Sequence, residues 1–133
     1  MEKTKVAFLC VHNSCRSQIA ECLMRKYGSD IVDVYSAGTL LKDSINSDAI
    51  RLMKSIYNID MSIEQSPKLI FDIPSVDYII TMGCNVSCPV LDYDYISEDW
   101  GLDDPSGKSD YEFKKVIDEI DFKVKDLIDR LKN

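Results

Sequence analysis

Apolar residues along this chain occur in two arrangements, short continuous runs and longer stretches in which they recur every three or four positions. Continuous runs predict buried strands, while the three-to-four spacing predicts amphipathic helices. We expect strands over residues 6–9, 32–37, 76–82 and 96–100. We expect helices over residues 17–27, 44–57 and 111–131. Ser66-Pro67 is a candidate start of one more short helix, because proline suits the first position of a helix.

Strands that alternate with helices along a chain are typical of a parallel sheet. The run Tyr78-Ile79-Ile80 is apolar without alternation, which indicates a strand buried on both of its faces. We therefore predict an α/β fold: a single domain over residues 1–133, with a four-stranded parallel sheet and helices on both faces. In such sheets the functional groups gather at the carboxyl ends of the strands, where Cys10 and Gly83-Cys84 occur.

The polar segment after the first strand has the features of an anion-binding loop. Cys10 opens it and Arg16 closes it in a C-x5-R pattern. A loop of this length can turn its backbone N–H groups toward one tetrahedral anion, and the following helix adds its positive end. The planar fork of Arg16 can bind two anion oxygens, and the positive potential favours the thiolate form of Cys10, to which Ser17 can donate a hydrogen bond. We expect the substrate to be bound by Val11, His12, Asn13, Ser14, Cys15, Arg16 and Ser17.

Composition narrows the choice of partners and of compartment. The chain has 16 Lys and Arg against 23 Asp and Glu, a net charge of −7, which argues against nucleic acid and anionic membranes as partners. Residues 1–9 lack the apolar core of a signal peptide, and no apolar run approaches the ~18 residues of a membrane span. We therefore expect a cytoplasmic protein, where five cysteines indicate catalysis, redox cycling or metal binding rather than structural disulfides.

Two of these cysteines, Cys84 and Cys88, follow the third expected strand and lie four residues apart. In a turn of helix both sulfurs would lie on one face, and a disulfide needs Cα atoms within ~7 Å, which this spacing permits with modest unwinding. His12 is the only histidine, and one pair of thiols is a poor zinc site. We therefore expect a redox pair, with no metal and no other cofactor. Two inert thiols are the alternative.

A third group of residues is Asp103-Asp104-Pro105. Transfer of an oxyanion to a thiolate requires a proton for the departing oxygen, and a carboxylic acid held over the anion supplies one. The proline fixes the backbone after Asp104. By itself the segment is equally typical of an ordinary Asp-Pro turn.

Taken together, C-x5-R-S after an N-terminal strand and the segment from Glu98-Asp99-Trp100-Gly101 to Asp103-Asp104-Pro105 resemble the low-molecular-weight protein tyrosine phosphatase superfamily. The chain most resembles its thioredoxin-coupled arsenate reductases. The resemblance implies that Asp104 is the general acid, with Asp103 as the weaker candidate. It also implies that arsenate is the substrate, with phosphate or sulfate as analogues.

The resemblance further implies a relay of thiols. Cys10 attacks arsenate, Cys84 then attacks the Cys10 sulfur and arsenite leaves, and Cys88 attacks Cys84. The resulting Cys84–Cys88 disulfide is reduced by an external dithiol of the thioredoxin or glutaredoxin type. In the best-known reductases, however, the two later cysteines lie farther apart in sequence than they do here.

Other features separate the members of this superfamily. Phosphatases usually carry aromatic residues after the Asp-Pro pair, whereas Ser106-Gly107 follow here and offer no stacking platform. Some members bind potassium at positions that match Asn13, Glu21 and Ser36. The remaining carboxylate ligand is replaced near Pro67, so we expect no bound potassium.

Two other functions stay open. A protein tyrosine phosphatase would use Cys10, Arg16 and Asp104 in the same way but would not need Cys84 or Cys88. A non-enzymatic thiol or metal sensor would use the cysteines without needing Asp104.

Overall fold

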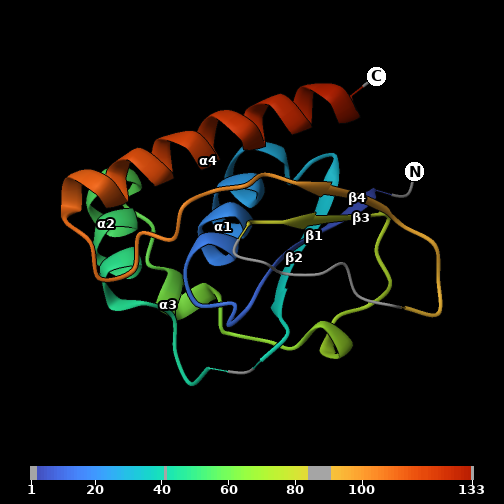
Figure 1. The fold of residues 1–133 in the computed structure, drawn as a ribbon. Coiled ribbons are helices and arrows are strands. Elements are labelled where there is room, and N and C mark those ends of the chain that lie inside the picture. The colour runs from blue at the N-terminus through green and yellow to red at the C-terminus, as the bar shows by residue number, and fades with distance from the viewer. Residues whose placement is uncertain (1–2, 41, 84–90, 133) are drawn as a thin grey trace.

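The computed structural model describes residues 3–40, 42–83 and 91–132. Four strands form one parallel sheet in the order β2-β1-β3-β4, with β1 and β3 in the middle (Figure 1). The strands are β1 (Thr4–Cys10), β2 (Val32–Gly38), β3 (Tyr78–Thr81) and β4 (Ile96–Asp99). The helices are α1 (Arg16–Gly28), α2 (Ser47–Tyr57), α3 (Met61–Glu64), the 3-10 helix η1 (Ile70–Asp72) and α4 (Asp110–Leu131). The predicted four-stranded parallel sheet is confirmed.

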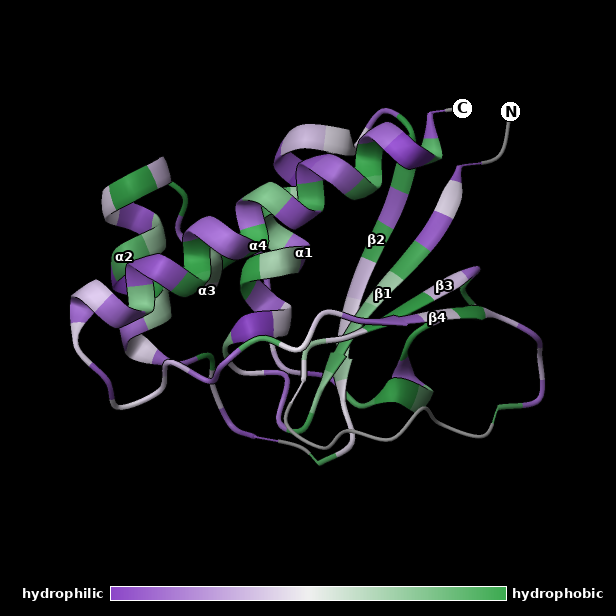
Figure 2. Cartoon of the chain, turned by 45° about the horizontal axis from the view of Figure 1, so that its top comes forward, coloured by the Kyte–Doolittle hydropathy of each residue, from purple (hydrophilic) through white to green (hydrophobic). Residues whose placement is uncertain are grey.

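The sheet is covered on both faces, but by different kinds of structure. Helices α1 and α4 pack against each other over one face, and α2 adds to their far end (Figure 1). Figure 2 shows the hydropathy that accompanies this packing. Strands β1 and β3 are largely hydrophobic, and α4 carries both hydrophobic and hydrophilic residues along its length. The second face carries a smaller apolar cluster that includes Leu9, Ile70 and Ile79, and η1 and residues 91–95 contribute to it. A 3-10 helix and a loop therefore take the place of an α-helix on this face.

The register of the sheet brings the end of β1 beside a glycine. Cys10, the last residue of β1, pairs with Gly38, the last residue of β2. A Cβ atom at Gly38 would lie 2.7 Å from the carbonyl oxygen of Val11 and 2.9 Å from the backbone nitrogen of Asn13, closer than real Cβ atoms approach. The loop that follows Cys10 can pass this point because residue 38 has no side chain.

The helix predicted over residues 44–57 begins later, at Ser47. The Asn46 side chain accepts hydrogen bonds from the backbone nitrogens of Asp48 (2.9 Å) and Ala49 (3.0 Å) and so caps the helix. The strands predicted over residues 76–82 and 96–100 are also shorter, at Tyr78–Thr81 and Ile96–Asp99.

The short helix predicted to start at Ser66-Pro67 is wrong. Residues 65–68 carry no helix; α3 ends before them at Glu64 and η1 begins after them at Ile70. The backbone of this segment bonds to other parts of the chain instead: Ser66 accepts a hydrogen bond from the Gln18 side chain (3.0 Å), and the Lys68 carbonyl accepts one from the Gly38 nitrogen (2.7 Å). These tertiary bonds override the local preference of proline. No helix in the described part of the chain is long and apolar enough to cross a lipid bilayer.

Candidate active site

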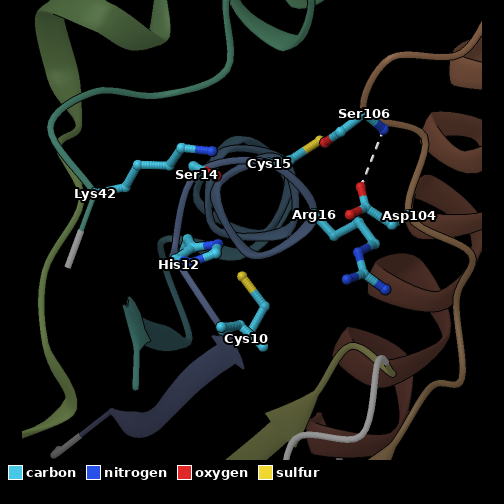
Figure 3. A pocket seen from close by; sticks show the side chains of 9 residues that line it. Cys10, His12, Ser14, Cys15, Arg16, Lys42, Asp104 and Ser106 are labelled. Atoms are coloured by element: carbon cyan, nitrogen blue, oxygen red, sulfur yellow. Dashed lines mark hydrogen bonds between the residues drawn. The ribbon is translucent and has the colours of Figure 1, made fainter. Parts of the chain in front are cut away.

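The candidate site is a pocket at the carboxyl end of β1, where the loop of residues 11–15 leads into α1 (Figure 3). Six of the nine residues that line it lie in the run from Cys10 to Arg16, and three come from other segments. The lining residues are Cys10, Val11, His12, Ser14, Cys15, Arg16, Lys42, Asp104 and Ser106. The pocket therefore joins Cys10, Arg16 and Asp104, three residues that the sequence singled out for chemistry.

Two residues of the predicted substrate-binding set, Asn13 and Ser17, do not line the pocket but lie fully buried behind it. The Asn13 amide donates a hydrogen bond to the Ser17 hydroxyl oxygen (2.8 Å), and that oxygen lies 2.8 Å from the Cys10 sulfur. Because the Ser17 oxygen accepts from Asn13, its own proton is available to Cys10. A chain of hydrogen bonds thus runs from Asn13 through Ser17 to the sulfur.

The hydrogen bonds of the side-chain oxygen fix the orientation of the Asn13 amide. This oxygen, Oδ1, accepts hydrogen bonds from the backbone nitrogen of Lys68 (2.8 Å) and from the side chain of Gln18 (3.0 Å). Asn13 also has a φ of 52°, a left-handed backbone conformation that asparagine tolerates better than most residues. The residue type therefore fits both the backbone turn and the hydrogen bonds that the loop requires.

Arg16 is buried, and its guanidinium is anchored to the backbone. Its Nη1 donates hydrogen bonds to the carbonyl oxygens of Met82 (3.0 Å) and Leu102 (2.6 Å), which follow β3 and β4. Two neighbouring strand ends thus hold the guanidinium at one side of the pocket, near Asp104 (Figure 3). This placement suits a planar fork that binds a tetrahedral oxyanion.

Asp104 faces the pocket from the loop between β4 and α4. Its Oδ1 accepts a hydrogen bond from the Ser106 backbone nitrogen (3.0 Å), drawn as the dashed line in Figure 3. Burial acts to raise the pKa of Asp104, but hydrogen bonds from Ser106 and the charges of Arg16 and Lys108 outweigh it and bring the pKa below its usual value. Asp104 is therefore a carboxylate at neutral pH in the empty pocket, and a proton must reach it before it can act as an acid.

Cys15 lies in the same loop as Cys10 but in a different environment. Burial is the main cause that raises the pKa of Cys15 to about 12, and the nearby Asp104 charge adds to it, while a hydrogen bond with Ser106 acts in the opposite direction. Cys15 therefore keeps its proton at neutral pH. Burial also raises the pKa of Cys22, on α1, to about 11.

The two later cysteines of the predicted relay, Cys84 and Cys88, lie outside the described residues. The described chain before them ends close to the site. The Met82 carbonyl accepts a hydrogen bond from Arg16, and Gly83 has a φ of 97°, a conformation that glycine adopts easily.

Of the three residues considered for potassium in the sequence analysis, Glu21 and Ser36 contact each other, while Asn13 bonds to Ser17 and Lys68. Glu21 is buried and accepts a hydrogen bond from the Ser36 hydroxyl. Its carboxylate pairs with Arg25 (2.7 Å) and lies 3.7 Å from the Lys68 ammonium, so two side-chain cations already balance its charge. In the described part of the chain, no three or more His, Cys, Asp or Glu side chains gather as a metal site would require.

Sequence reasoning did not identify Lys42 or Gln18 as parts of the site. Gln18 looks like an ordinary helix residue, and Lys42 lies in a segment without hydrophobic periodicity. Gln18 bonds to Asn13 in the loop and to Ser66 from a distant segment, while Lys42 reaches the pocket because the fold brings its segment beside the loop. No sequence signal for either residue was available.

Comparisons with known proteins agree with this geometry. A family model described as low molecular weight phosphotyrosine protein phosphatase matches residues 5–133. Arsenate reductase 1 of Staphylococcus epidermidis is 40% identical to the chain over 123 residues, which are 90% of this chain and 92% of that protein. A solved structure described as an arsenate reductase in the phosphate binding state is similar with a TM-score of 0.86 and 33% identity, over 96% of this chain and 98% of that chain. A thioredoxin-dependent arsenate reductase of Corynebacterium glutamicum is similar with a TM-score of 0.78 and 32% identity, over 98% of this chain and 62% of that chain.

Proposed function

This chain belongs to the low molecular weight phosphotyrosine protein phosphatase family, and on that basis we propose that it is an arsenate reductase with Cys10 as its nucleophile. The observation that carries the proposal is the hydrogen-bonded chain from Asn13 through Ser17 to the Cys10 sulfur, with 2.8 Å at each step, beside the anchored Arg16. A sulfur held in this way below an anion-binding loop is suited to attack on a tetrahedral oxyanion. Relatives named arsenate reductase support arsenate as that oxyanion.

The first step forms a bond between sulfur and arsenic. The Cys10 thiolate attacks arsenate while the oxyanion is held by Arg16 and the loop. One arsenic–oxygen bond breaks, and the departing oxygen leaves as water after it takes a proton from Asp104. Because Asp104 is ionised in the empty pocket, it takes up this proton from solvent when the oxyanion binds beside it.

The second step reduces arsenic. The Cys84 thiolate attacks the Cys10 sulfur, so a sulfur–sulfur bond forms and the arsenic–sulfur bond breaks. Its electron pair stays on arsenic, which passes from As(V) to As(III) and leaves as arsenite, while the two cysteines are oxidised to a disulfide. Cys88 then attacks Cys84, which frees Cys10 and leaves a Cys84–Cys88 disulfide. An external dithiol of the thioredoxin or glutaredoxin type reduces it and supplies the two electrons.

A phosphatase would share the first half of this chemistry, since Cys10, Arg16 and Asp104 also suit phosphate transfer to a thiolate. What favours reduction is the lining of the pocket. Among the described lining residues there is no Phe, Tyr or Trp, and Ser106 stands directly after Pro105. A phosphotyrosine ring would find no aromatic side chain to stack on.

The test is arsenate-dependent oxidation of NADPH in the presence of thioredoxin and thioredoxin reductase, with a parallel assay that supplies glutathione and glutaredoxin. We expect multiple turnover with one of the two reductants and only slow hydrolysis of an aryl phosphate. Cys10→Ser is the matched control and should lack both activities. Fast hydrolysis of the aryl phosphate without arsenate turnover in either assay would favour a phosphatase.

A further inference from the structure

Lys42 lies on the segment between β2 and α2, and this segment is attached to the anion-binding loop on both sides of Lys42. Before it, the backbone nitrogens of Thr39 and Leu40 donate to the Val11 carbonyl (2.9 and 2.8 Å). After it, the Asn46 nitrogen donates to the Ser14 carbonyl (2.7 Å). Lys42 is therefore carried by a segment that is held against the loop at both ends.

The Lys42 side chain extends over Ser14 toward the pocket, while Arg16, Asp104 and Ser106 approach from the opposite side (Figure 3). Its ammonium forms no hydrogen bond or ion pair with the part of the chain described here, although Asp43 is its neighbour in sequence. An exposed lysine that has no partner among the described residues and is directed at an anion pocket has its charge available for the anion.

The charges around the pocket explain why a second cation matters. Arg16 contributes one positive charge, but the Asp104 carboxylate and a Cys10 thiolate each contribute a negative one, and the whole chain carries −7. A doubly charged oxyanion meets this repulsion twice as strongly as a singly charged one. Without Lys42 the side chains that line the pocket would carry more negative than positive charge.

We propose that Lys42 is a second cationic binding residue of the oxyanion pocket and that it selects doubly charged over singly charged tetrahedral oxyanions. The inference rests on the proposed function only in taking arsenate as the natural oxyanion. Because the interaction between two charges scales with each of them, loss of Lys42 costs a dianion about twice the binding free energy that it costs a monoanion. The logarithms of the two losses in affinity therefore have a ratio of about two.

The test measures anion binding without turnover, by protection of Cys10 from iodoacetamide at constant ionic strength. Sulfate is the doubly charged probe and perchlorate the singly charged one. In Lys42→Ala we expect the half-protecting sulfate concentration to rise about five- to tenfold and that of perchlorate about two- to threefold. Lys42→Arg should restore most of the sulfate affinity, and added salt should shrink the difference between the variants.

Lys114→Ala is the matched control, since it removes the same charge from an exposed position on α4 that does not line the pocket. The proposal is overturned if Lys42→Ala binds sulfate as the parent does, if sulfate and perchlorate lose affinity equally, or if Lys114→Ala has the same effect. Lys42→Gln, which keeps a long polar side chain, should behave like Lys42→Ala. A parent protein that is protected by sulfate but does not reduce arsenate would refute the proposed function and leave the role of Lys42 intact.

Discussion

The hydroxyl oxygen of Ser17 lies 2.8 Å from the sulfur of Cys10, and both residues are buried. Ser17 stands at the second position of α1, one turn away from Asn13, which donates to the same oxygen. The Ser17 proton is thus left available to the Cys10 sulfur by a residue that does not touch the sulfur itself.

Ser17→Ala should lower the reactivity of Cys10. A hydrogen bond to a charged group contributes about 1.5–3 kcal/mol, so its loss should slow alkylation of Cys10 by roughly tenfold or more. The rate of iodoacetamide alkylation at constant pH measures this. Asn13→Ala should slow the reaction as well, but by less. Equal rates in Ser17→Ala and the parent would contradict a role for this hydrogen bond.

Cys10→Ser and Arg16→Ala should each abolish turnover, since one removes the nucleophile and the other removes the group that holds the oxyanion. Loss of such an electrostatic group commonly costs ~10²–10³ in rate. Arg16→Lys keeps the charge, but a lysine cannot both bond to the backbone carbonyls of Met82 and Leu102 and offer a planar fork. We expect steady-state rates of Arg16→Lys near those of Arg16→Ala. Near-normal turnover in Arg16→Ala would remove the anion-loop interpretation.

Asp104→Asn should lower kcat by ~10²-fold or more, because the departing oxygen loses its proton source. The pKa of Asp104 lies below its usual value, so the group is ionised at neutral pH and must take up a proton as arsenate binds. In the parent, kcat/KM should therefore fall as pH rises and this proton becomes harder to acquire. Rate profiles of both proteins check this: the fall should be weaker in Asp104→Asn. A parent kcat/KM that increases through the same range would contradict the role.

Cys15→Ser should keep most of the activity. Burial and the Asp104 charge raise the pKa of Cys15 to about 12, so this thiol is protonated wherever Cys10 reacts. At mildly acidic pH, peptide mapping should find iodoacetamide on Cys10 and not on Cys15. Stoichiometric label on Cys15 would reverse the assignment. Under oxidation we expect an off-pathway disulfide between Cys15 and Cys10.

The later cysteines separate the reductase from a phosphatase. Cys88→Ser should stop multiple turnover yet release roughly one arsenite per protein, because only the last thiol exchange requires Cys88. The protein should then be trapped as a Cys10–Cys84 disulfide. Cys84→Ser should release almost no arsenite, while slow aryl-phosphate hydrolysis continues. Quenched-flow counting of arsenite with disulfide mapping tests both variants, and parental arsenate turnover in both would make these cysteines bystanders.

The sequence by itself determined the parallel sheet, the order of most of its elements and the loop from Cys10 to Arg16. These features depend on residues that are close in the chain. Hydrophobic spacing predicts strands and helices because it records which side of each element is buried. The distance from Cys10 to Arg16 is likewise set by the few bonds between them, so a spacing pattern is enough to predict an anion-binding loop.

The tertiary structure alone decided how distant segments complete the site. It placed Lys42 over the loop, tied Arg16 to the carbonyls of Met82 and Leu102, and buried Cys15 near Asp104. It also turned the segment expected to start a helix at Ser66 into one bonded to Gln18 and Gly38. These outcomes depend on backbone hydrogen bonds and burial between residues tens of positions apart. Such contacts leave no periodic pattern in the sequence, because any residue has the same backbone groups to offer.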